Sequence, residues 1–206
     1  SDWSSDVCSS DLLLNNDTEV ITLNWLEEML MYAERKDVGA VGAKLYYPDQ
    51  TIQHAGIVLG LGAHRTAGHS HYRVNKENLG YMGRLCYAQN VSAVTGACLM
   101  VRKSLFDEVG GLEEDLEVAL NDVDLCLKIM KAGYWNVWTP FAELYHYESA
   151  SRGGDLEGEG AKRYEKECEY FRQKWKEILD KGDPFYNVNF SLDRSDYSLR
   201  KIDEKV

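Results

Sequence analysis

The stretch LLLNNDTEV, residues 12–20, decides how the rest of this chain is interpreted. Three leucines run directly into Asn15, Asn16 and Asp17. A continuous apolar run of this kind predicts the end of a buried strand. In open α/β sheets, ligands bind beyond the carboxyl ends of the strands, so the three polar residues are candidates for a binding site. A polar turn that leads into a helix is the alternative that the residues alone leave open.

Alternating strand and helix patterns follow this stretch. Apolar residues at helical spacing predict helices from Thr22 to about Arg35, from Ser104 to about Gly110, over 121–133 and over 160–181, with Thr22 and Ser104 as N-caps. Apolar segments predict strands from Val38, over 51–60, on both sides of Gly96, and as two short strands over 134–140 and 142–148. Residues 38–59 are expected to form a hairpin, and 60–84 a long loop. The mixture predicts an α/β fold.

Composition excludes several classes of protein. The 206 residues suit one domain, and 23 basic against 34 acidic residues give a net charge of −11, which would repel a nucleic acid. No apolar run approaches the roughly 20 residues of a membrane span, and no signal-peptide pattern is visible. The five cysteines are scattered and form no CxxC pair, which predicts reduced thiols in a cytoplasmic protein.

The first eleven residues, SDWSSDVCSSD, have neither helical nor strand periodicity. The segment DVCSSDL, residues 6–12, resembles the translation of a common sequencing-adapter oligonucleotide. We therefore expect residues 1–11 to be a non-native leader and the natural protein to extend further upstream.

The helix predicted over 121–133 carries an acid in an unusual place. On a helical wheel, Asp124, Lys128 and Lys131 share one side, whereas Asp122 falls within the apolar arc. One interpretation is a first-turn acid that stabilises the helix dipole by about 0.3–1 kcal/mol, with Asn121 as the cap. The other is a carboxylate at the floor of a cleft that accepts a proton from a hydroxyl. The wheel does not choose between them.

Two further segments have a chemical and a structural interpretation. Asp17, with a neutral oxygen from Asn15 or Asn16, could hold a hard divalent cation. His146 lies in a strand-like segment and is either structural or a ligand. Arg152, which two glycines follow, is either a phosphate clamp or part of a solvated connection.

Taken together and in this order, these segments resemble the second half of the catalytic domain of a family-2 inverting glycosyltransferase, of the bacterial rhamnosyltransferase or O-antigen type. The matching pieces are LLLNNDTEV, TIQHAGIVLG, VTGACLMVRKSLFDEVGGL, NDVDLCLKIMKAGY, YHYESASRG and GDPFYNVNFS. They span nearly everything from Leu12 to Ser191.

The resemblance implies an A-type glycosyltransferase fold, with a mixed sheet and flanking helices. It implies a nucleotide-diphosphate sugar as donor, a glycan or lipid-linked saccharide as acceptor, and a divalent cation, Mn²⁺ or Mg²⁺. Residues 12–182 would be the C-terminal part of the catalytic domain, and 183–206 an extended tail. The family's nucleotide-binding half would lie upstream, so this chain would bind the donor poorly. Whether the protein associates peripherally with the inner face of the cell membrane stays open.

The resemblance also assigns roles to residues. Asn15, Asn16 and Asp17 occupy the place of the family's DxD motif, and Asp122 the place of its catalytic base. The implied assignments are Asp17 and His146 for the metal, Asn15, Asn16, Asp17, Gly96, Ala97 and Arg152 for the donor, and Asn121 for the acceptor side. Asn15 and Asn121 stand where the family has acids, and each removes one charge.

Two rival functions come from other classes of protein. A metal-dependent hydrolase could use His54, His64, His69 and His71, although their spacing fits no HExxH-like helix. A non-catalytic carbohydrate-binding module could use the tyrosine and tryptophan rings as stacking faces. In the second case Asp122→Asn would leave sugar binding unchanged.

Overall fold

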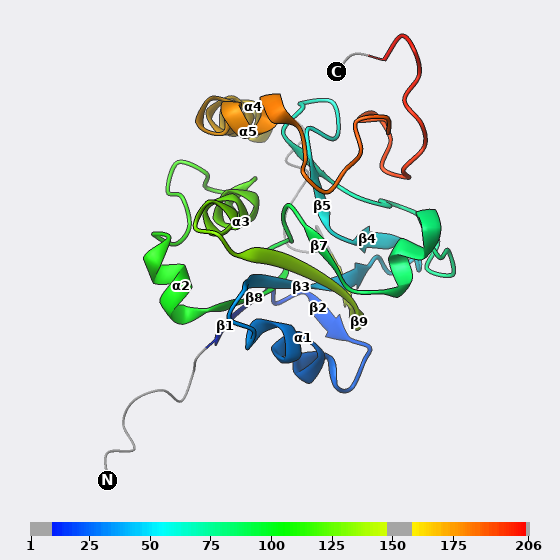
Figure 1. The fold of residues 1–206 in the computed structure, drawn as a ribbon, viewed down its shortest axis with the longest axis vertical. Coiled ribbons are helices and arrows are strands. Elements are labelled where there is room, and N and C mark those ends of the chain that lie inside the picture. The colour runs from blue at the N-terminus through cyan, green and yellow to red at the C-terminus, as the bar shows by residue number, and fades with distance from the viewer. Residues whose placement is uncertain (1–9, 148–157, 205–206) are drawn as a thin grey trace.

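The protein is described here from a computed structural model that covers residues 10–147 and 158–204 (Figure 1). Its main sheet is mixed and runs in the order β1-β8-β3-β9-β2, with β4 beside β3 and β7 beside β9. Strands β3 and β9 are parallel and the other pairs are antiparallel. The strands are β1 (Ser10–Leu14), β2 (Thr18–Val20), β3 (Val38–Tyr46), β4 (Ile52–His54), β7 (Gln89–Val91), β8 (Cys98–Arg102) and β9 (Trp135–His146).

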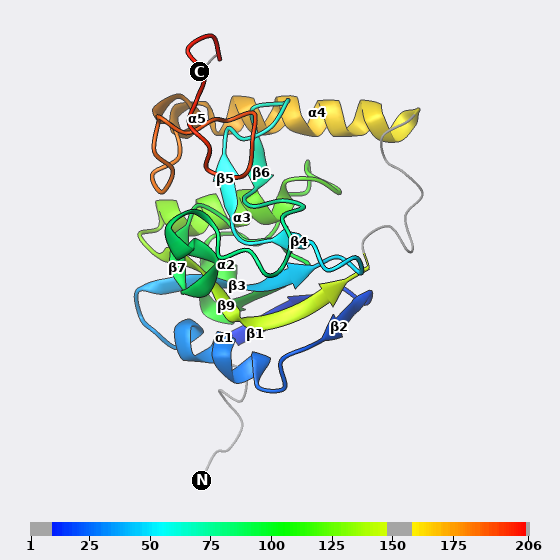
Figure 2. The same ribbon diagram turned by 90° about the vertical axis from the view of Figure 1, so that its right-hand side faces the viewer.

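Helices cover both faces of this sheet, which confirms the α/β prediction (Figures 1 and 2). Helix α1 (Trp25–Ala33) buries Met29 and Ala33 against one face. Helix α3 (Asn121–Lys131) buries its apolar side against the other, and α4 (Glu159–Lys174) lies beyond α3 (Figure 2). The remaining helices are α2 (Lys103–Glu108), α5 (Lys176–Lys181) and the 3-10 helix η1 (Tyr81–Cys86).

Glycines in β3 allow neighbouring elements to approach closely. A Cβ on Gly39 would lie 2.2 Å from Cγ2 of Ile129 in α3, and one on Gly42 would lie 2.5 Å from Cβ of Val94. The sequence VGAVGA therefore sets the distance between the sheet and α3, the helix that carries Asp122.

Three predicted elements are divided differently in the structure. The strand expected over 51–60 is two strands, because Gly56 turns the chain with φ +90, and β5 (Ile57–Leu59) pairs with β6 (Ala67–His69) in a separate two-stranded sheet. The two strands expected over 134–148 are one strand, β9, with an irregularity opposite Gly42 and Lys44. The helix expected over 160–181 is interrupted at Trp175.

Strand β1 is not the buried strand that the leucines indicated. It lies at the end of the sheet order, and Leu14 is 43% exposed. Ser10 and Asp11 already pair with β8, so β1 begins inside the expected leader. The expected N-caps are also wrong, because the Thr22 hydroxyl accepts the Glu143 N–H, while Ser104 lies within α2.

The C-terminal segment, residues 183–204, is not extended as expected but folds back on β5. Tyr186 and Tyr197 pack against Val58 and Leu61. The Asp183 carboxylate accepts the backbone N–H of Leu59 at 2.7 Å. Burial of these aromatic rings favours the folded-back arrangement over an extended one.

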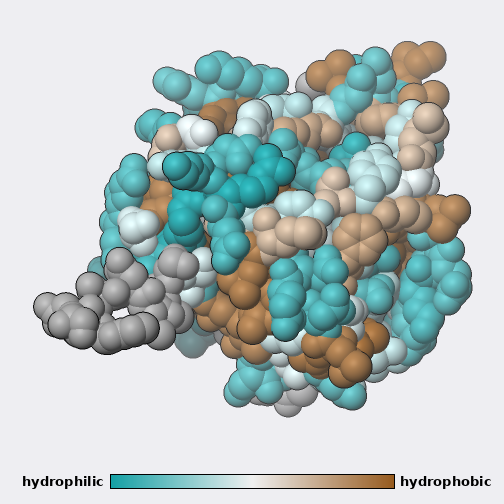
Figure 3. All heavy atoms as spheres, turned by 60° about the horizontal axis from the view of Figure 1, so that its bottom comes forward, coloured by the Kyte–Doolittle hydropathy of each residue, from teal (hydrophilic) through white to brown (hydrophobic). Residues whose placement is uncertain are grey.

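The face that carries α1 comes forward in Figure 3, where apolar patches interrupt a polar surface. The exposed apolar residues of this part of the chain include Ile21, Leu23 and Met31. None of the described helices combines the length and the apolar character needed to span a bilayer.

Candidate active site

Asp122 lies in the first turn of α3, a helix that no side chain caps. Leu120, just before it, has a left-handed backbone with φ 63. Oδ2 of Asp122 accepts the backbone N–H of Gly96 at 2.8 Å, and Oδ1 accepts that of Val123 at 2.8 Å. The half-buried carboxylate is therefore held in place by two backbone donors.

The polar side that the helical wheel grouped in α3 is partly covered in the structure. Asp124 is fully buried, because α4 and the residue after it cover that side of the helix. Its carboxylate lies 2.9 Å from Lys128 Nζ and 2.8 Å from Lys174 Nζ, and Trp175 Nε1 donates to it at 2.7 Å. Asp124 is thus a structural acid, and Asp122 is the acid that keeps partial access to solvent.

The polar residues after β1 meet the end of β9. His146 Nε2 lies 3.1 Å from Asn15 Nδ2 and 3.1 Å from Asp17 Oδ1. The backbone supports this contact, because Tyr147 N donates to Asp17 O at 2.9 Å. The antiparallel pairing of β2 with β9 places Thr18 opposite His146 and so holds the two segments in register.

The His146 ring is oriented by a residue that the sequence did not single out. Nδ1 lies 2.7 Å from Gln53 Oε1 in β4, and since a carboxamide oxygen only accepts, Nδ1 carries the proton. Nε2 then faces Asn15 and Asp17. The sequence signal that could have revealed this role is the polar pair Gln53 and His54, which interrupts the otherwise apolar segment 51–60.

One short turn joins the two halves of the site. Ala97 O accepts the backbone N–H of Asn15 at 3.0 Å, while Gly96 N donates to Asp122. Next to this turn, a cleft of about 410 Å³ is lined by residues that include Gln53, Thr95 and His146. Asn15 and Asp122 therefore both contact this turn, Asn15 through Ala97 O and Asp122 through Gly96 N.

The other expected site residues have weaker structural support. Asn16 is exposed in the turn after β1, and Asn121 begins α3 half-buried. Arg152 lies outside the described residues.

The four histidines of the hydrolase alternative do not form one centre. His54 and His69 are in contact, with their Nδ1 atoms 3.0 Å apart. His71 instead stacks on Tyr197, and His64 contacts Tyr164 edge to face. Within residues 10–147 and 158–204, no three His, Cys, Asp or Glu side chains gather around one point.

Comparison with known proteins places the chain in a family. The model of glycosyl transferase family group 2 matches residues 45–175, more than half of the chain, including Gly96, Asp122 and His146. The chain belongs to this family. The mixed sheet with helices on both faces is consistent with the A-type fold expected of a family-2 glycosyltransferase.

Three curated proteins illustrate what this family-2 chain is similar to. The protein y4gI of Sinorhizobium fredii, which is uncharacterised, is 54% identical over 188 residues, 91% of this chain and 20% of that protein. The O-antigen biosynthesis protein RfbC of Myxococcus xanthus is 37% identical over 205 residues, 98% of this chain and 16% of that protein. An N-acetylglucosaminyl-diphospho-decaprenol L-rhamnosyltransferase of Mycobacterium tuberculosis is 42% identical over 65 residues, 32% of this chain and 21% of that protein.

The chain spans about a fifth of the length of the curated relatives that it matches.

Proposed function

We propose that the protein containing this chain transfers a sugar from a nucleotide-diphosphate donor to a glycan or lipid-linked acceptor, with inversion, in the synthesis of a cell-surface polysaccharide. Family membership supports sugar transfer, and the names of the relatives connect it to O-antigen synthesis and rhamnosyl transfer. The observation that supports the proposal is the turn at 95–97, which contacts Asp122 through Gly96 N and Asn15 through Ala97 O.

Asp122 is the proposed base. The N–H groups of Gly96 and Val123 hold its carboxylate in one orientation, and a carboxylate held in this way can accept a proton from a hydroxyl. It takes the proton of an acceptor hydroxyl while that oxygen attacks the anomeric carbon from the face opposite the leaving diphosphate. Attack from that face inverts the configuration at the anomeric carbon. Asn121, next to Asp122, is proposed to face the acceptor.

Asp17 and His146 are the proposed ligands of a divalent cation, Mn²⁺ or Mg²⁺. Asp17 Oδ1 is buried and accepts no hydrogen bond, although it lies 3.1 Å from His146 Nε2, which carries a lone pair when Nδ1 donates to Gln53. Two electron-rich atoms this close fit a shared cation, and the Gln53 contact is the outer hydrogen bond that metal-binding histidines usually make. When bound, the cation would neutralise charge on the donor diphosphate.

The remaining donor contacts are proposed from the resemblance. Asn15 and Asn16 would face the diphosphate, Gly96 and Ala97 would form the wall of the pocket, and Arg152 would clamp a phosphate. Because Asn15 replaces an acid, the site carries one negative charge fewer, and we expect weaker cation binding than with an acid there.

The test uses the full-length protein that contains this chain. With Mn²⁺ and a panel of nucleotide-diphosphate sugars, the native protein is expected to transfer sugar to an acceptor glycan. Asp122→Asn should abolish transfer and leave donor binding intact, while Lys131→Ala, which removes an exposed charge at the other end of α3, should change neither. Full transfer by Asp122→Asn would rule out Asp122 as the base. Sugar binding without transfer in the native protein would favour the carbohydrate-binding module.

A further inference from the structure

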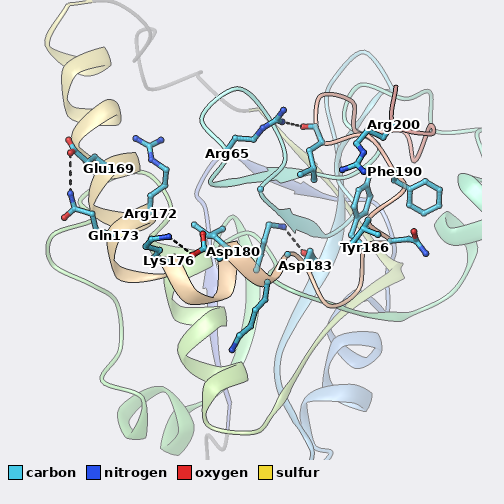
Figure 4. Close-up of a pocket in the computed structure, with 18 residues that line it drawn as sticks. Arg65, Glu169, Arg172, Gln173, Lys176, Asp180, Asp183, Tyr186, Phe190 and Arg200 are labelled. Carbon is cyan, nitrogen blue, oxygen red and sulfur yellow. Dashed lines mark hydrogen bonds and ion pairs between the residues drawn. The ribbon is translucent and has the colours of Figure 1, made fainter. Parts of the chain in front are cut away.

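A second cavity lies apart from Asp122. It is a groove of about 850 Å³ between helices α4–α5 and the C-terminal segment (Figure 4). Arg172 and Lys176 line it from the helices, Arg65 from the connection between β5 and β6, and Arg200 from the C-terminal segment. Ligand pockets usually occupy roughly 300–1,000 Å³, so the groove has the size of a binding site. The proposed transfer chemistry does not use these residues.

The charge of the groove opposes that of the chain. The cationic residues that line it are Arg65, Arg172, Lys176, Lys181 and Arg200, and the acidic ones are Glu169, Asp180 and Asp183. The whole chain has a net charge of −11, so cations are gathered here against the overall balance. A concave surface with an excess of one sign of charge attracts ligands of the opposite sign.

Interactions within the protein already engage the three acids. Asp180 pairs with Lys176 at 2.5 Å, and Asp183 accepts the backbone N–H groups of Leu59 and Phe185. Glu169 accepts the side-chain amide of Gln173 at 3.4 Å.

Two of the cations, by contrast, keep their charge available. Within the part of the chain that the structure describes, neither the Arg200 guanidinium nor the Lys181 ammonium pairs with a carboxylate. The groove therefore offers positive charge to an anionic ligand.

Rings and apolar side chains form the rest of the wall. Phe190 and Tyr186 lie on the side of the groove that carries Arg200 (Figure 4). Tyr186 is buried and its hydroxyl donates to Ser191 O at 2.7 Å, so the partly exposed Phe190 supplies the ring that a ligand can contact. Ring faces beside a guanidinium suit a ligand that combines a flat apolar face with an acidic group. An acidic sugar has both features.

The groove and the cleft beside His146 share one wall. Leu192 lines the groove, and its neighbour Asp193 lines the cleft of about 410 Å³. Arg65 joins the two, because it lines the groove, pairs with Asp193 at 2.6 Å and donates to Leu192 O at 2.8 Å. The two cavities are therefore neighbours on the two sides of one short segment.

We propose that the groove binds an acidic part of the acceptor, a sugar residue with a carboxylate or phosphate substituent, while the end of the same glycan reaches the cleft. This inference rests on the proposed function, since it takes the acceptor to be a glycan. The ligand class is an acidic oligosaccharide, and its acid has two sources, a uronic acid or a sugar phosphate.

Binding of defined probes to this chain, without donor or cation, tests the inference. The probes are trigalacturonate, glucose 6-phosphate, the neutral trisaccharide maltotriose and inorganic phosphate, with affinities measured by calorimetry. We expect trigalacturonate or glucose 6-phosphate to bind at least tenfold more tightly than maltotriose and phosphate, and the tighter of the two identifies the acid. Arg200→Ala with Lys181→Ala should weaken this binding at least tenfold. The matched control, Lys36→Ala with Lys131→Ala, removes two exposed lysines outside the groove and should have no effect.

Several results would overturn the inference. Equal affinity for maltotriose would remove the role of charge, and equal affinity for inorganic phosphate would reduce the groove to a simple anion site. Unchanged binding in the Arg200/Lys181 variant would place the ligand elsewhere, and displacement of the saccharide by tighter-binding geranyl diphosphate would favour a lipid. The calorimetric binding assay involves no sugar transfer. Its result therefore stands even if the native protein shows no transferase activity. Failure of the native chain to bind either acidic probe, together with transfer to a neutral acceptor, would sink this inference alone.

Discussion

Glu167 of α4 accepts the backbone N–H of Ala119 at 2.7 Å. The same carboxylate accepts the N–H of Val118 at 3.3 Å, and its side chain is only 3% exposed. These backbone groups lie two and three residues before Asn121, where α3 begins. Because no side chain caps α3, this contact from α4 fixes the approach of the chain to Asp122.

Glu167→Ala should loosen the start of α3. The two N–H groups lose their acceptors, which costs about 1–3 kcal/mol if they stay buried. We expect faster hydrogen exchange over 118–123, measured by mass spectrometry. Glu165→Ala, which removes an exposed acid from the same helix, is the control and should leave exchange unchanged. Unaltered exchange in the Glu167 variant would show that the contact does not position Asp122.

Asp124→Ala should destabilise the whole domain. The change leaves Lys128, Lys174 and the Trp175 indole without their shared buried acceptor, and loss of one partner of a buried ion pair costs about 3–5 kcal/mol. Urea unfolding measures the change. The control variant, Asp107→Ala, breaks an exposed ion pair with Lys103 in α2. We expect its free energy of unfolding to fall by less than about 1 kcal/mol. Similar losses in the two variants would contradict the structural role of Asp124.

Gly39→Ala should strain the contact between β3 and α3. The new Cβ would lie 2.2 Å from Ile129 Cγ2, and overfilling a core of this kind costs about 1–3 kcal/mol. Thermal unfolding should show a lower midpoint. Gly96→Ala is the matched control, because its new Cβ would lie 3.4 Å from Cβ of Asp122, which is an ordinary contact. The thermal unfolding midpoint of this variant should therefore change less. A larger shift for Gly96→Ala would show that the close approach at Gly39 is not limiting.

His71 should make stability depend on pH. Burial lowers the pKa of His71 to about 4, Arg84 and Lys44 act in the same direction, and Asp196 opposes them. In the unfolded chain the His71 ring binds a proton near pH 6.5, whereas in the folded chain it does so only near pH 4. The free energy of unfolding is therefore highest above pH 6.5, and it falls by about 3 kcal/mol as the pH is lowered toward 4.

Replacement of the ring isolates this effect. His71 has φ 52, a backbone conformation that Asn tolerates, so His71→Asn is the suitable variant. Urea unfolding at pH 7 and pH 5 should show a smaller loss on acidification in the variant than in the native chain. The same loss in both would assign the pH dependence to other groups, such as His54, whose pKa burial also lowers.

Asp17→Ala should remove the proposed cation site without unfolding the protein. We expect Mn²⁺ affinity, measured by electron paramagnetic resonance of the free ion, to fall at least tenfold, because the variant loses the charged ligand. Glu19→Ala, which removes a nearby exposed acid, should keep the native affinity. If both variants bind Mn²⁺ as the native chain does, the cation site is not at Asp17.

The sequence by itself determined the α/β class, strand β3 from Val38, and helix α3 with its stop at Gly133, where φ is +95. These features depend on apolar spacing and on backbone preferences that act within a few residues. The order of the motifs also indicated the family, which the family match confirms.

Only the tertiary structure decided which acid of α3 is buried and what surrounds the site. The wheel could not place Asp124 correctly, because the residues that bury it, Lys174 and Trp175, come about fifty positions later. Likewise the turn at Gly96 joins Asp122 to Asn15, and Gln53 orients His146, through contacts between distant segments. Local periodicity reports which side of an element is apolar, whereas the partner that covers a side depends on how distant segments pack together.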